Sequence, residues 1–463
     1  DYEIGKKYSL HEVNGEVKIS DQSSDFKPIN IFNDDAWSND NVPEPFTNLD
    51  RFKVRKLVIE KLSDLQLLVK EEKHHISVPR GERSNIVIEP KLSHQWYVAT
   101  SDMALKANKA VNDGEIRFHP ENWVKTYFNW MNNIEDWCVS RQIWWGHRIP
   151  AWFDDEKNVY VGFNEDDVRE FYGLDDRQLT QDEDVLDTWF SASLWPFASL
   201  GWPKSSREYN KYFPTSLLVT GFDIIFFWVA RMMMMSIEFT DKIPFKDVYV
   251  TGLIRDENGQ KMSKSKGNII DPLDLVYGIS LEDLVKKRTA NLMQEGQAEK
   301  IEKKTRKQFP NGIESYGTDA LRMTFYSMAT HTKDISFELG RLKGYRNFCT
   351  KIWNAARFIN GFPDGNEIFK PLNDNDKWIN EEFNKSSKKI ERHINEYRLD
   401  FAINEVYEFF WGKFCDVYLE ECKKTSKTQN LKPMLQKILI MMHPFAPFIT
   451  EEIHSLLFKS SII

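Results

Sequence analysis

The sequence predicts a multidomain protein in which an α/β parallel sheet of the Rossmann type precedes an α-helical bundle. The sheet is predicted by a β-branched strand at 216–220, an apolar helix at 223–237 and a second strand at 245–254. A strand, a helix and a strand in this order form a right-handed parallel crossover, the unit of nucleotide-binding sheets. The bundle is predicted by apolar residues at helical spacing after Pro272. A chain of 463 residues has room for about two to four domains.

The part before the sheet favours β-structure. Residues 1–93 are expected to hold strands at 17–19 and 86–88, with a helix at 49–72 between them. The α/β pattern then occupies residues 94–275. The helical part that follows has apolar residues at helical spacing in 321–328, 348–359, 390–422 and 435–457.

The composition is that of a globular protein, with 41% hydrophobic, 29% charged and 14% aromatic residues. The longest apolar candidate for a membrane span, 224–237, is interrupted by Arg231 and is too short to cross a bilayer. The four cysteines are scattered without a CxxC pair, which argues against a zinc knuckle and a disulfide framework. We therefore expect a cytoplasmic protein without membrane association and without a bound metal site.

One basic segment stands out in a chain whose net charge is −8. Its cationic residues are Lys286, Lys287, Arg288, Lys300, Lys303, Lys304, Arg306 and Lys307. Local clustering matters more for RNA binding than the total charge. The alternatives are a surface that contacts RNA phosphates and a solvated amphipathic helix.

The stretch KMSKSKGN at 261–268 is the most informative part of the sequence. It follows the second predicted strand and a turn, and it alternates lysines with small polar residues before Gly267. Such a loop can bring ammonium groups and hydroxyls to a polyphosphate, and a glycine permits a close backbone approach. The alternative for this loop alone is a solvated basic turn.

This loop resembles the KMSKS signature of class I aminoacyl-tRNA synthetases. Residues 136–150 are similar to the WCxSRQxxWGxxIP motif of the valine, isoleucine and leucine enzymes of that class, and 187–191 are similar to their DTWFxS motif. Residues 442–453 resemble the opening of the last helix in their anticodon-binding bundle. Within this subgroup, 220–228 and 287–314 are similar to the valine branch. The resemblance covers essentially the whole chain.

The resemblance implies an enzyme, a ligase that activates valine with ATP to valyl-adenylate and transfers it to tRNA(Val). ATP is then a substrate that arrives with Mg²⁺, and the protein is expected to act as a monomer. Negative charge builds on the phosphates during activation, so fixed cations near them lower the barrier. Lys261 and Lys264 are the candidates for this role, with Ser263 and Ser265 as hydrogen-bond donors.

The remaining parts of the synthetic site follow the first predicted strand. Gly221 and Asp223 are implied to hold the adenylate with Lys264, and Asp223 is implied to accept from ribose hydroxyls. The alternative for Asp223 is a helix N-cap. Trp189, Ile224 and Trp228 are implied to line the amino-acid pocket, with Ile224 one helical turn before Trp228. Core packing is the alternative for both tryptophans.

A pocket of this kind rejects threonine poorly because threonine is nearly isosteric with valine, a weakness for which this enzyme family is itself the standard example. The resemblance therefore implies a second site that hydrolyses mischarged threonyl-tRNA(Val). Asp1 opens a DYExG stretch that is similar to the end of an editing motif, and a frayed terminus is the alternative. The residues implied to contact tRNA are Lys300, Lys303, Lys304, Lys307 and Arg346. A solvated face is the alternative for the helix of Arg346.

The insert that contains Arg141 and His147 is expected to have a structural role. Its tryptophans, Trp137, Trp144 and Trp145, suggest an aromatic cluster that packs together. On the family's pattern the expected domains are the end of the editing domain at 1–93, the second half of the catalytic domain at 94–275, a basic connecting region at 276–345 and a truncated anticodon-binding bundle at 346–463.

The sequence departs from the family's pattern in lacking its HIGH motif, for which the histidines at 74 and 75 are no match. We therefore expect a fragment of a longer protein that is inactive alone, because half of the ATP site would be missing. Two alternatives stay open at this point. One is an isoleucine or leucine enzyme, against which residues 224–228 and 286–311 argue. The other is a tRNA-binding fragment without catalysis.

Overall fold

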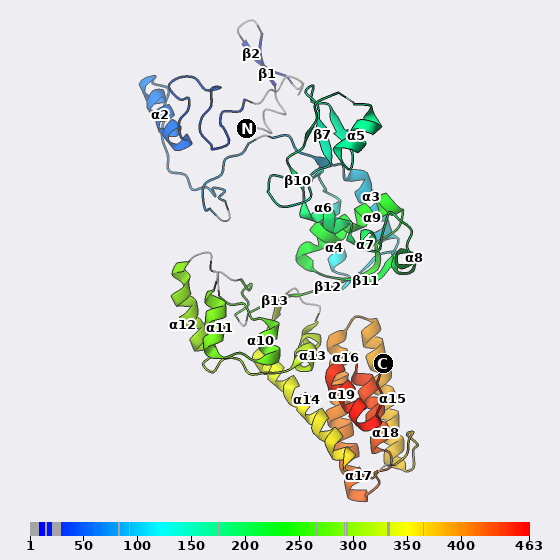
Figure 1. Cartoon of the computed structure of the whole chain (residues 1–463). Coiled ribbons are helices and arrows are strands. Elements are labelled where there is room, and N and C mark those ends of the chain that lie inside the picture. Colours follow the sequence, from blue (N-terminus) through cyan, green and yellow to red (C-terminus); the bar gives the residue numbers. More distant parts are fainter. Residues whose placement is uncertain are drawn as a thin grey trace. The chain divides into compact units, whose positions relative to one another are not determined.

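The computed structural model describes residues 9–13, 16–20, 29–81, 84–91, 93–174, 176–256, 258–263, 267–290, 292, 295–330, 334–363 and 365–463. The chain divides into two compact units, Asp1–Trp96 and Tyr97–Ile463 (Figure 1). Each unit is described by itself. The division falls near the boundary expected at residue 93, and the expected domain bounds stay predictions.

The described residues of the first unit hold little regular structure. Strands β1 (Ser9–Val13) and β2 (Glu16–Ser20) form an antiparallel hairpin, and helix α2 spans Arg51–Asp64. The helix expected at 49–72 is shorter at both ends. It begins after Asp50, whose carboxylate accepts hydrogen bonds from two backbone N–H groups of the first turn, and the left-handed Gln66 follows its end. The strand expected at 86–88 is wrong, because Val87 makes only an isolated bridge with Arg80.

The second unit contains the parallel sheet that the sequence predicts. Its strands are β4 (Arg117–His119), β11 (Thr215–Gly221) and β12 (Phe245–Thr251), in the order β11–β12–β4. Both neighbouring pairs are parallel, and Gly221 lies opposite Thr251. Strands β11 and β12 therefore end at the same edge of the sheet.

The outer strand β11 is covered on one face. Leu218 is buried, whereas Leu217 and Val219 keep 39% and 53% of their surface exposed. In the part of the chain that the structure describes, β12 is the one strand that pairs with β11.

The crossover between β11 and β12 is not the regular helix expected at 223–237. It consists of the 3-10 helix η2 (Phe222–Ile224), the π-helix η3 (Ile225–Ala230) and the α-helix α9 (Arg231–Thr240). The consecutive methionines 232–235 of α9 are buried in a core to which the sheet and the helices α3 (Ser101–Asn112) and α4 (Trp123–Met131) also contribute. Short π-helical turns are frequent at functional sites.

The second strand expected at 245–254 is divided by Gly252. After β12 ends, β13 (Leu253–Arg255) leaves the main sheet and pairs in parallel with β14 (Asp334–Ser336). The chain thus passes from the main sheet to a second small sheet immediately before the KMSKS loop.

Between α4 and β11 lies the insert. Its short strands are β5 (Trp137–Cys138), β6 (Ser140–Arg141), β7 (Ala151–Phe153), β8 (Val159–Val161), β9 (Thr180–Gln181) and β10 (Val185–Leu186), and its helices are α5 (Glu165–Tyr172), α6 (Thr188–Ser193), α7 (Trp195–Ala198) and α8 (Arg207–Tyr212). Strand β3 (Tyr97–Val98), which precedes α3, pairs with β5 in an antiparallel manner. The expected aromatic cluster is wrong in part. Trp137 is buried, but Trp144 and Trp145 project into solvent at 105% and 92% exposure.

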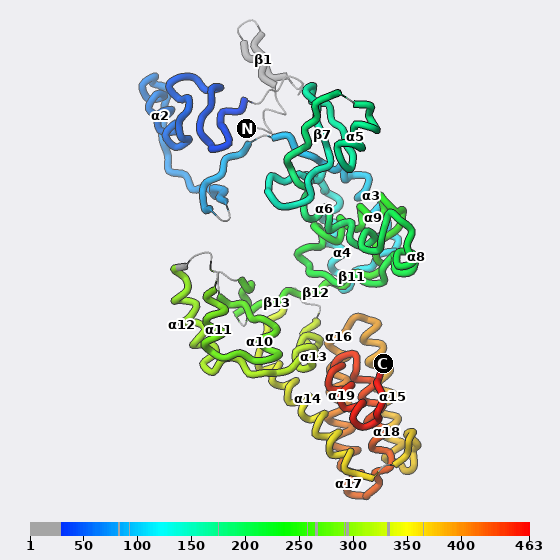
Figure 2. The backbone as a smooth tube through the Cα atoms, in the orientation of Figure 1, coloured from blue at the N-terminus to red at the C-terminus, as the bar shows by residue number. Residues whose placement is uncertain are grey.

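Apart from β14, the remainder is helical, as expected. Its elements are α10 (Pro272–Tyr277), α11 (Leu281–Thr289), η5 (Glu295–Gln297), α12 (Ala298–Gln308), α13 (Thr318–Met328), α14 (Leu339–Asn360), α15 (Asp374–Asn395), α16 (Leu399–Glu408), η6 (Phe409–Leu419), α17 (Glu420–Thr425), α18 (Leu431–Met442) and α19 (Pro447–Phe458). The tube in Figure 2 runs from yellow at α14 to red at α19. Phe348, Phe410 and Phe414 are fully buried in the core that these helices share.

Two of the periodic segments are interrupted. The segment at 390–422 turns at Tyr397, whose φ of 55° is left-handed, and the segment at 435–457 turns between α18 and α19. The start of α19 is capped from another helix, since the buried Asp319 of α13 accepts hydrogen bonds from the N–H groups of Phe448 (3.4 Å) and Ile449 (2.6 Å). Burial raises the pKa of Asp319 above its usual range.

Candidate active site

The KMSKS loop is closed at its base by two buried side chains. The Asp256 carboxylate accepts from the N–H groups of Asn258 (3.1 Å) and Gln260 (2.8 Å) and from Asn268 Nδ2 (2.9 Å). Asn268 also accepts from the N–H of Ser263 at 2.9 Å and donates to the carbonyl of Lys261 at 3.3 Å. Burial alone would raise the pKa of Asp256, but these hydrogen bonds lower it below its usual range.

Asp256 and Asn268 thus fix where the loop leaves and rejoins the fold, a role that the sequence analysis missed. The short run Asp-x-Asn-Gly after a strand is a turn pattern that could have indicated it. Lys261 is exposed and Ser263 is half-buried. Lys264 and Ser265 lie outside the described residues.

Gly267 ends the loop in the left-handed conformation, with φ of 60°. A Cβ at this position would lie 2.3 Å from Cγ2 of Ile301 in α12. The glycine is therefore needed for close contact with a neighbouring helix, in addition to its backbone conformation. This contact packs α12 against the signature loop.

Gly221 and Asp223 lie at the carboxyl edge of the sheet, as expected. A Cβ on Gly221 would lie 2.7 Å from Oδ1 of Asp223, so the glycine leaves room for that carboxylate. Asp223 is exposed and lies within η2. The N-cap alternative for Asp223 is wrong, because Gly221 occupies the cap of η2, and Ile224 and Ala230 occupy the next two caps without side-chain hydrogen bonds.

The three residues expected to line the amino-acid pocket lie on adjoining elements. Trp189 of α6 stacks on Phe227, with ring centroids 6.2 Å apart, and Trp228 packs against the core of the sheet. Ile224 and Trp228 are separated by the start of the π-helix, so the spacing of a regular helix on which their shared face was predicted does not apply. Their assignment to a pocket stays a prediction.

Asp187 connects these elements. Its Oδ2 accepts from Trp137 Nε1 (3.0 Å), from Arg141 Nη2 (3.0 Å) and from Arg231 Nη1 (3.2 Å). Its Oδ1 accepts from the N–H of Trp189 at 3.1 Å and thereby caps α6. Asp187 is only 4% exposed.

The structural role expected for Arg141 agrees with its contact to Asp187. Arg231, to which the sequence analysis gave no role in the site, lies 3.9 Å from the ring centroid of Trp137 and is buried. Burial lowers the pKa of its guanidinium, an effect that the Asp187 carboxylate partly offsets. His147 is exposed, and its carbonyl accepts from the N–H of Leu186.

The basic segment is divided between α11 and α12. Of its residues in α11, Arg288 is buried, Lys287 pairs with Asp271 and Asp274, and Lys286 is exposed. Ile301 and Thr305 are buried, whereas Lys300, Lys303, Lys304 and Lys307 are exposed. Arg306 is held by two carboxylates, Glu282 and Glu302. Within the described ranges, none of the four lysines has an ion-pair partner. Arg346 is engaged inside the protein, since Nη1 donates to Glu314 at 2.9 Å and the guanidinium lies over Tyr316.

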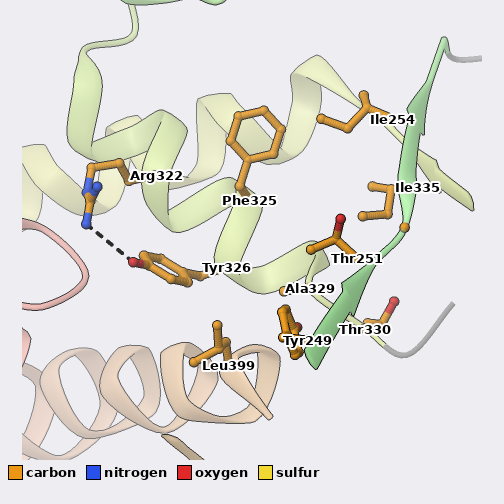
Figure 3. Close-up of a pocket in the computed structure, with 11 residues that line it drawn as sticks. Tyr249, Thr251, Ile254, Arg322, Phe325, Tyr326, Ala329, Thr330, Ile335 and Leu399 are labelled. Carbon is orange, nitrogen blue, oxygen red and sulfur yellow. Dashed lines mark hydrogen bonds between the residues drawn. The ribbon is translucent and has the colours of Figure 1, made fainter. Parts of the chain in front are cut away.

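A cavity of about 410 Å³ lies where β12 and β13 meet α13 and α16 (Figure 3). Tyr249 and Thr251 of β12 line it, with Phe325 of α13 and Leu399 of α16. Arg322 donates to the hydroxyl of Tyr326 at its margin, at 3.3 Å, and to the carbonyl of Pro444. None of the residues expected from the sequence lines this cavity.

Two family models match the chain. The model for class I tRNA synthetases (I, L, M and V) matches residues 9–338, and the model for the anticodon-binding domain of tRNA ligases matches residues 376–463. Solved structures share the fold. A methionyl-tRNA synthetase of Mycobacterium tuberculosis bound to methionyl-adenylate has a TM-score of 0.54 at 16% identity, covering 82% of this chain and 66% of the other. The LeuRS–tRNA–LeuAMS complex of Agrobacterium radiobacter K84 has a TM-score of 0.53 at 17% identity, covering 71% and 42%.

The chain belongs to the class I tRNA synthetase family, in the group of the isoleucine, leucine, methionine and valine enzymes. Its relatives include the valine–tRNA ligases of Legionella pneumophila (strain Lens) and Francisella tularensis, each 49% identical over 98% of this chain, and that of Coxiella burnetii, 48% identical over the same share. The chain spans about half the length of these curated relatives, 49% in each case. The resemblance to this class is therefore confirmed.

Proposed function

We propose that this chain is part of a valine–tRNA ligase, which forms valyl-adenylate from valine and ATP and transfers the valyl group to tRNA(Val). The observation that carries the proposal is the KMSKS loop, closed by Asp256 and Asn268, in a chain whose sheet edge presents Gly221 and Asp223. The similarity to valine–tRNA ligases over 98% of the chain supports valine as the amino acid.

In this proposal the valine carboxylate attacks the α-phosphate of ATP, and pyrophosphate leaves. Lys261 and Lys264 stabilise the charge that develops on the phosphates, with Ser263 and Ser265 donating hydrogen bonds. Gly221 and Asp223 hold the adenylate. Mg²⁺ fits as an ion carried mainly by the phosphates and water, since no group of three or more potential metal-ligating side chains occurs among the described residues.

The remaining assignments extend this proposal. Trp189, Ile224 and Trp228 would line the valine pocket. Residues 1–93 would belong to an editing domain that hydrolyses threonyl-tRNA(Val); Asp1 lies outside the described residues. We further propose a monomer that acts in the cytoplasm. No helix in the described part of the chain is long and apolar enough to span a bilayer.

The proposal is tested by ATP–pyrophosphate exchange with a version of the protein that has the full length of its relatives. We expect exchange that depends on valine, because the pocket recognises a short branched side chain, and weaker exchange with isoleucine or leucine. Exchange driven best by isoleucine or leucine would assign the chain to another member of the group. Exchange with none of the three would favour the fragment that binds tRNA without catalysis.

We expect the exposed lysines of α12 to contact tRNA phosphates. Replacing Lys300, Lys303, Lys304 and Lys307 with glutamine should weaken tRNA binding and flatten its salt dependence, because each lost phosphate contact reduces counterion release. The plot of log K for tRNA binding against log salt concentration has a negative slope, and this slope should become shallower by up to about 0.7–0.9 for each phosphate contact that is lost. The control carries the same loss of charge elsewhere, at Lys106, Lys109, Lys204 and Lys211. Equal slopes for both variants would assign the α12 lysines to a solvated face.

A further inference from the structure

A second cavity, of about 490 Å³, borders the signature loop. Gly267 of the loop lines it, together with Pro272 of α10 and Leu284 and Arg288 of α11. Its other walls are apolar at Ile269, Ile270 and Ala290 and charged at Asp271, Asp274 and Lys287. Apart from Gly267, which lets the backbone of the loop approach closely, none of the residues to which we assign amino-acid activation lines this cavity.

Arg288 is the unusual member of this cavity because it is 92% buried and only partly hydrogen-bonded; its exposed fraction is 8%. Its Nη1 makes two long contacts, with Thr305 Oγ1 at 3.4 Å and Gln308 Oε1 at 3.5 Å. Its guanidinium lies over the ring of Phe309, 4.9 Å from the centroid. Nε and Nη2 are buried and have no hydrogen-bond partner in the described structure. A buried cationic group with two unused donors is unfavourable unless something accepts from it.

The two unused donors share one edge of the planar guanidinium. N–H groups on such an edge match the two oxygens of a carboxylate or phosphate. This chain uses the same pair of atoms elsewhere. Nε and Nη2 of Arg117 hold the two oxygens of Asp247 at 2.9 Å each, and those of Arg398 hold Asp400 at 3.0 and 2.7 Å. Arg288 presents this edge without a carboxylate.

The charged side chains around the cavity limit the net charge that a bound ligand can carry. The Lys287 ammonium lies between two carboxylates that also line the cavity, 2.6 Å from Asp271 and 2.8 Å from Asp274. These hydrogen bonds raise the pKa of Lys287. Lys287 and Arg288 carry two positive charges, and the carboxylates of Asp271 and Asp274 carry two negative charges, so the net charge of these four side chains is zero. With no surplus positive charge, the cavity favours one negative charge over two, and its apolar walls favour an organic body.

We propose that this cavity binds a singly charged oxyanion, a phosphodiester or a carboxylate on an apolar body, held in a bidentate manner by Nε and Nη2 of Arg288. A free organic anion and the backbone of an RNA both present this chemistry. The proposal does not depend on the proposed ligase activity, because anion binding is measured without amino-acid activation.

The test is calorimetric titration of the purified chain with diethyl phosphate and with benzoate. We expect saturable binding with one site per chain. Arg288→Lys keeps the positive charge but removes the pair of parallel N–H donors, and it should weaken binding about 10-fold or more. Ala290→Trp places a large ring at an exposed residue of the cavity wall and should weaken binding similarly while Arg288 stays in place. Arg169→Lys is the control, because Nε and Nη2 of Arg169 already donate hydrogen bonds to Glu165. This substitution should leave binding of the probes unchanged.

Absence of saturable binding by both probes would overturn the proposal, as would equal affinities in the wild type and the Ala290→Trp variant. The second comparison remains decisive if Arg288→Lys fails to fold. Addition of tRNA then identifies the source of the anion. Displacement of diethyl phosphate by tRNA supports a phosphodiester of RNA, and undisturbed binding supports a free organic anion.

Discussion

Replacing Asp187 with alanine should destabilise the second unit by about 3–5 kcal/mol, the effect of removing one partner from a buried ion pair. The reason is that Arg231 stays buried over Trp137 without a carboxylate, and Trp137 Nε1 and the N–H of Trp189 lose their acceptor. The free energy of unfolding is measured by urea denaturation, with hydrogen exchange of α6 and α9 to locate the loss.

A double-mutant cycle separates the ion pair from the other contacts of Asp187. If the uncompensated guanidinium carries most of the cost, adding Arg231→Met to Asp187→Ala should restore part of the lost stability. Asp187→Asn keeps an acceptor for Trp137 and for the N-terminus of α6, and should cost less than the alanine variant. Strictly additive effects of the substitutions at 187 and 231 would contradict this account, because contacting residues of a buried pair should couple.

Lys264→Ala should lower kcat of valine activation by about 10²–10³-fold, equivalent to about 2.7–4 kcal/mol of transition-state stabilisation. The proposed role of Lys264 is to meet charge that develops only as pyrophosphate leaves, so KM for ATP should change little. The measurement is ATP–pyrophosphate exchange at varied ATP concentration, in a protein of the relatives' full length.

Two further variants test whether the loss of kcat in Lys264→Ala is specific to the signature loop. Lys307→Ala removes an exposed lysine at the far end of α12 and should leave exchange unchanged. Asn268→Ala removes the bridge between Asp256 and Ser263, and should lower kcat through misplacement of the loop, since Asn268 is a positioning residue. An effect of Lys264→Ala on KM alone would show that the lysine binds ATP without favouring the transition state.

The parallel sheet and the helical bundle could be predicted because their signals are local and repeated. The apolar runs of β11 and β12 and the periodic residues of α13 and α14 follow directly from burial. The breaks within elements were harder to predict. The π-helix η3 lies in an apolar run that has the periodicity of an ordinary helix, and the division of β12 from β13 depends on β14, about 80 residues later.

The sequence motifs predicted where the candidate site lies, but they did not predict the contacts that hold it together. The KMSKS motif indicated the loop, but Asp256 and Asn268, which close it, act through hydrogen bonds that no motif records. Gly267 was expected to permit approach to a ligand, and it also permits approach to Ile301. Trp144 and Trp145 show the limit of composition, because aromatic residues in sequence predict packing only where a partner surface exists.

The half-covered strand β11 has a consequence for handling this chain. Its seven residues, 215–221, contain no charge and no proline, and Leu217 and Val219 face solvent. Among the described strands β11 pairs with β12 alone, and an uncharged, β-prone strand at the edge of a sheet is a template on which further copies can add as strands. We therefore expect this segment to limit the solubility of the isolated chain at high concentration. The substitution Val219→Lys should reduce aggregation, because a charge on an edge strand disfavours the addition of a further strand.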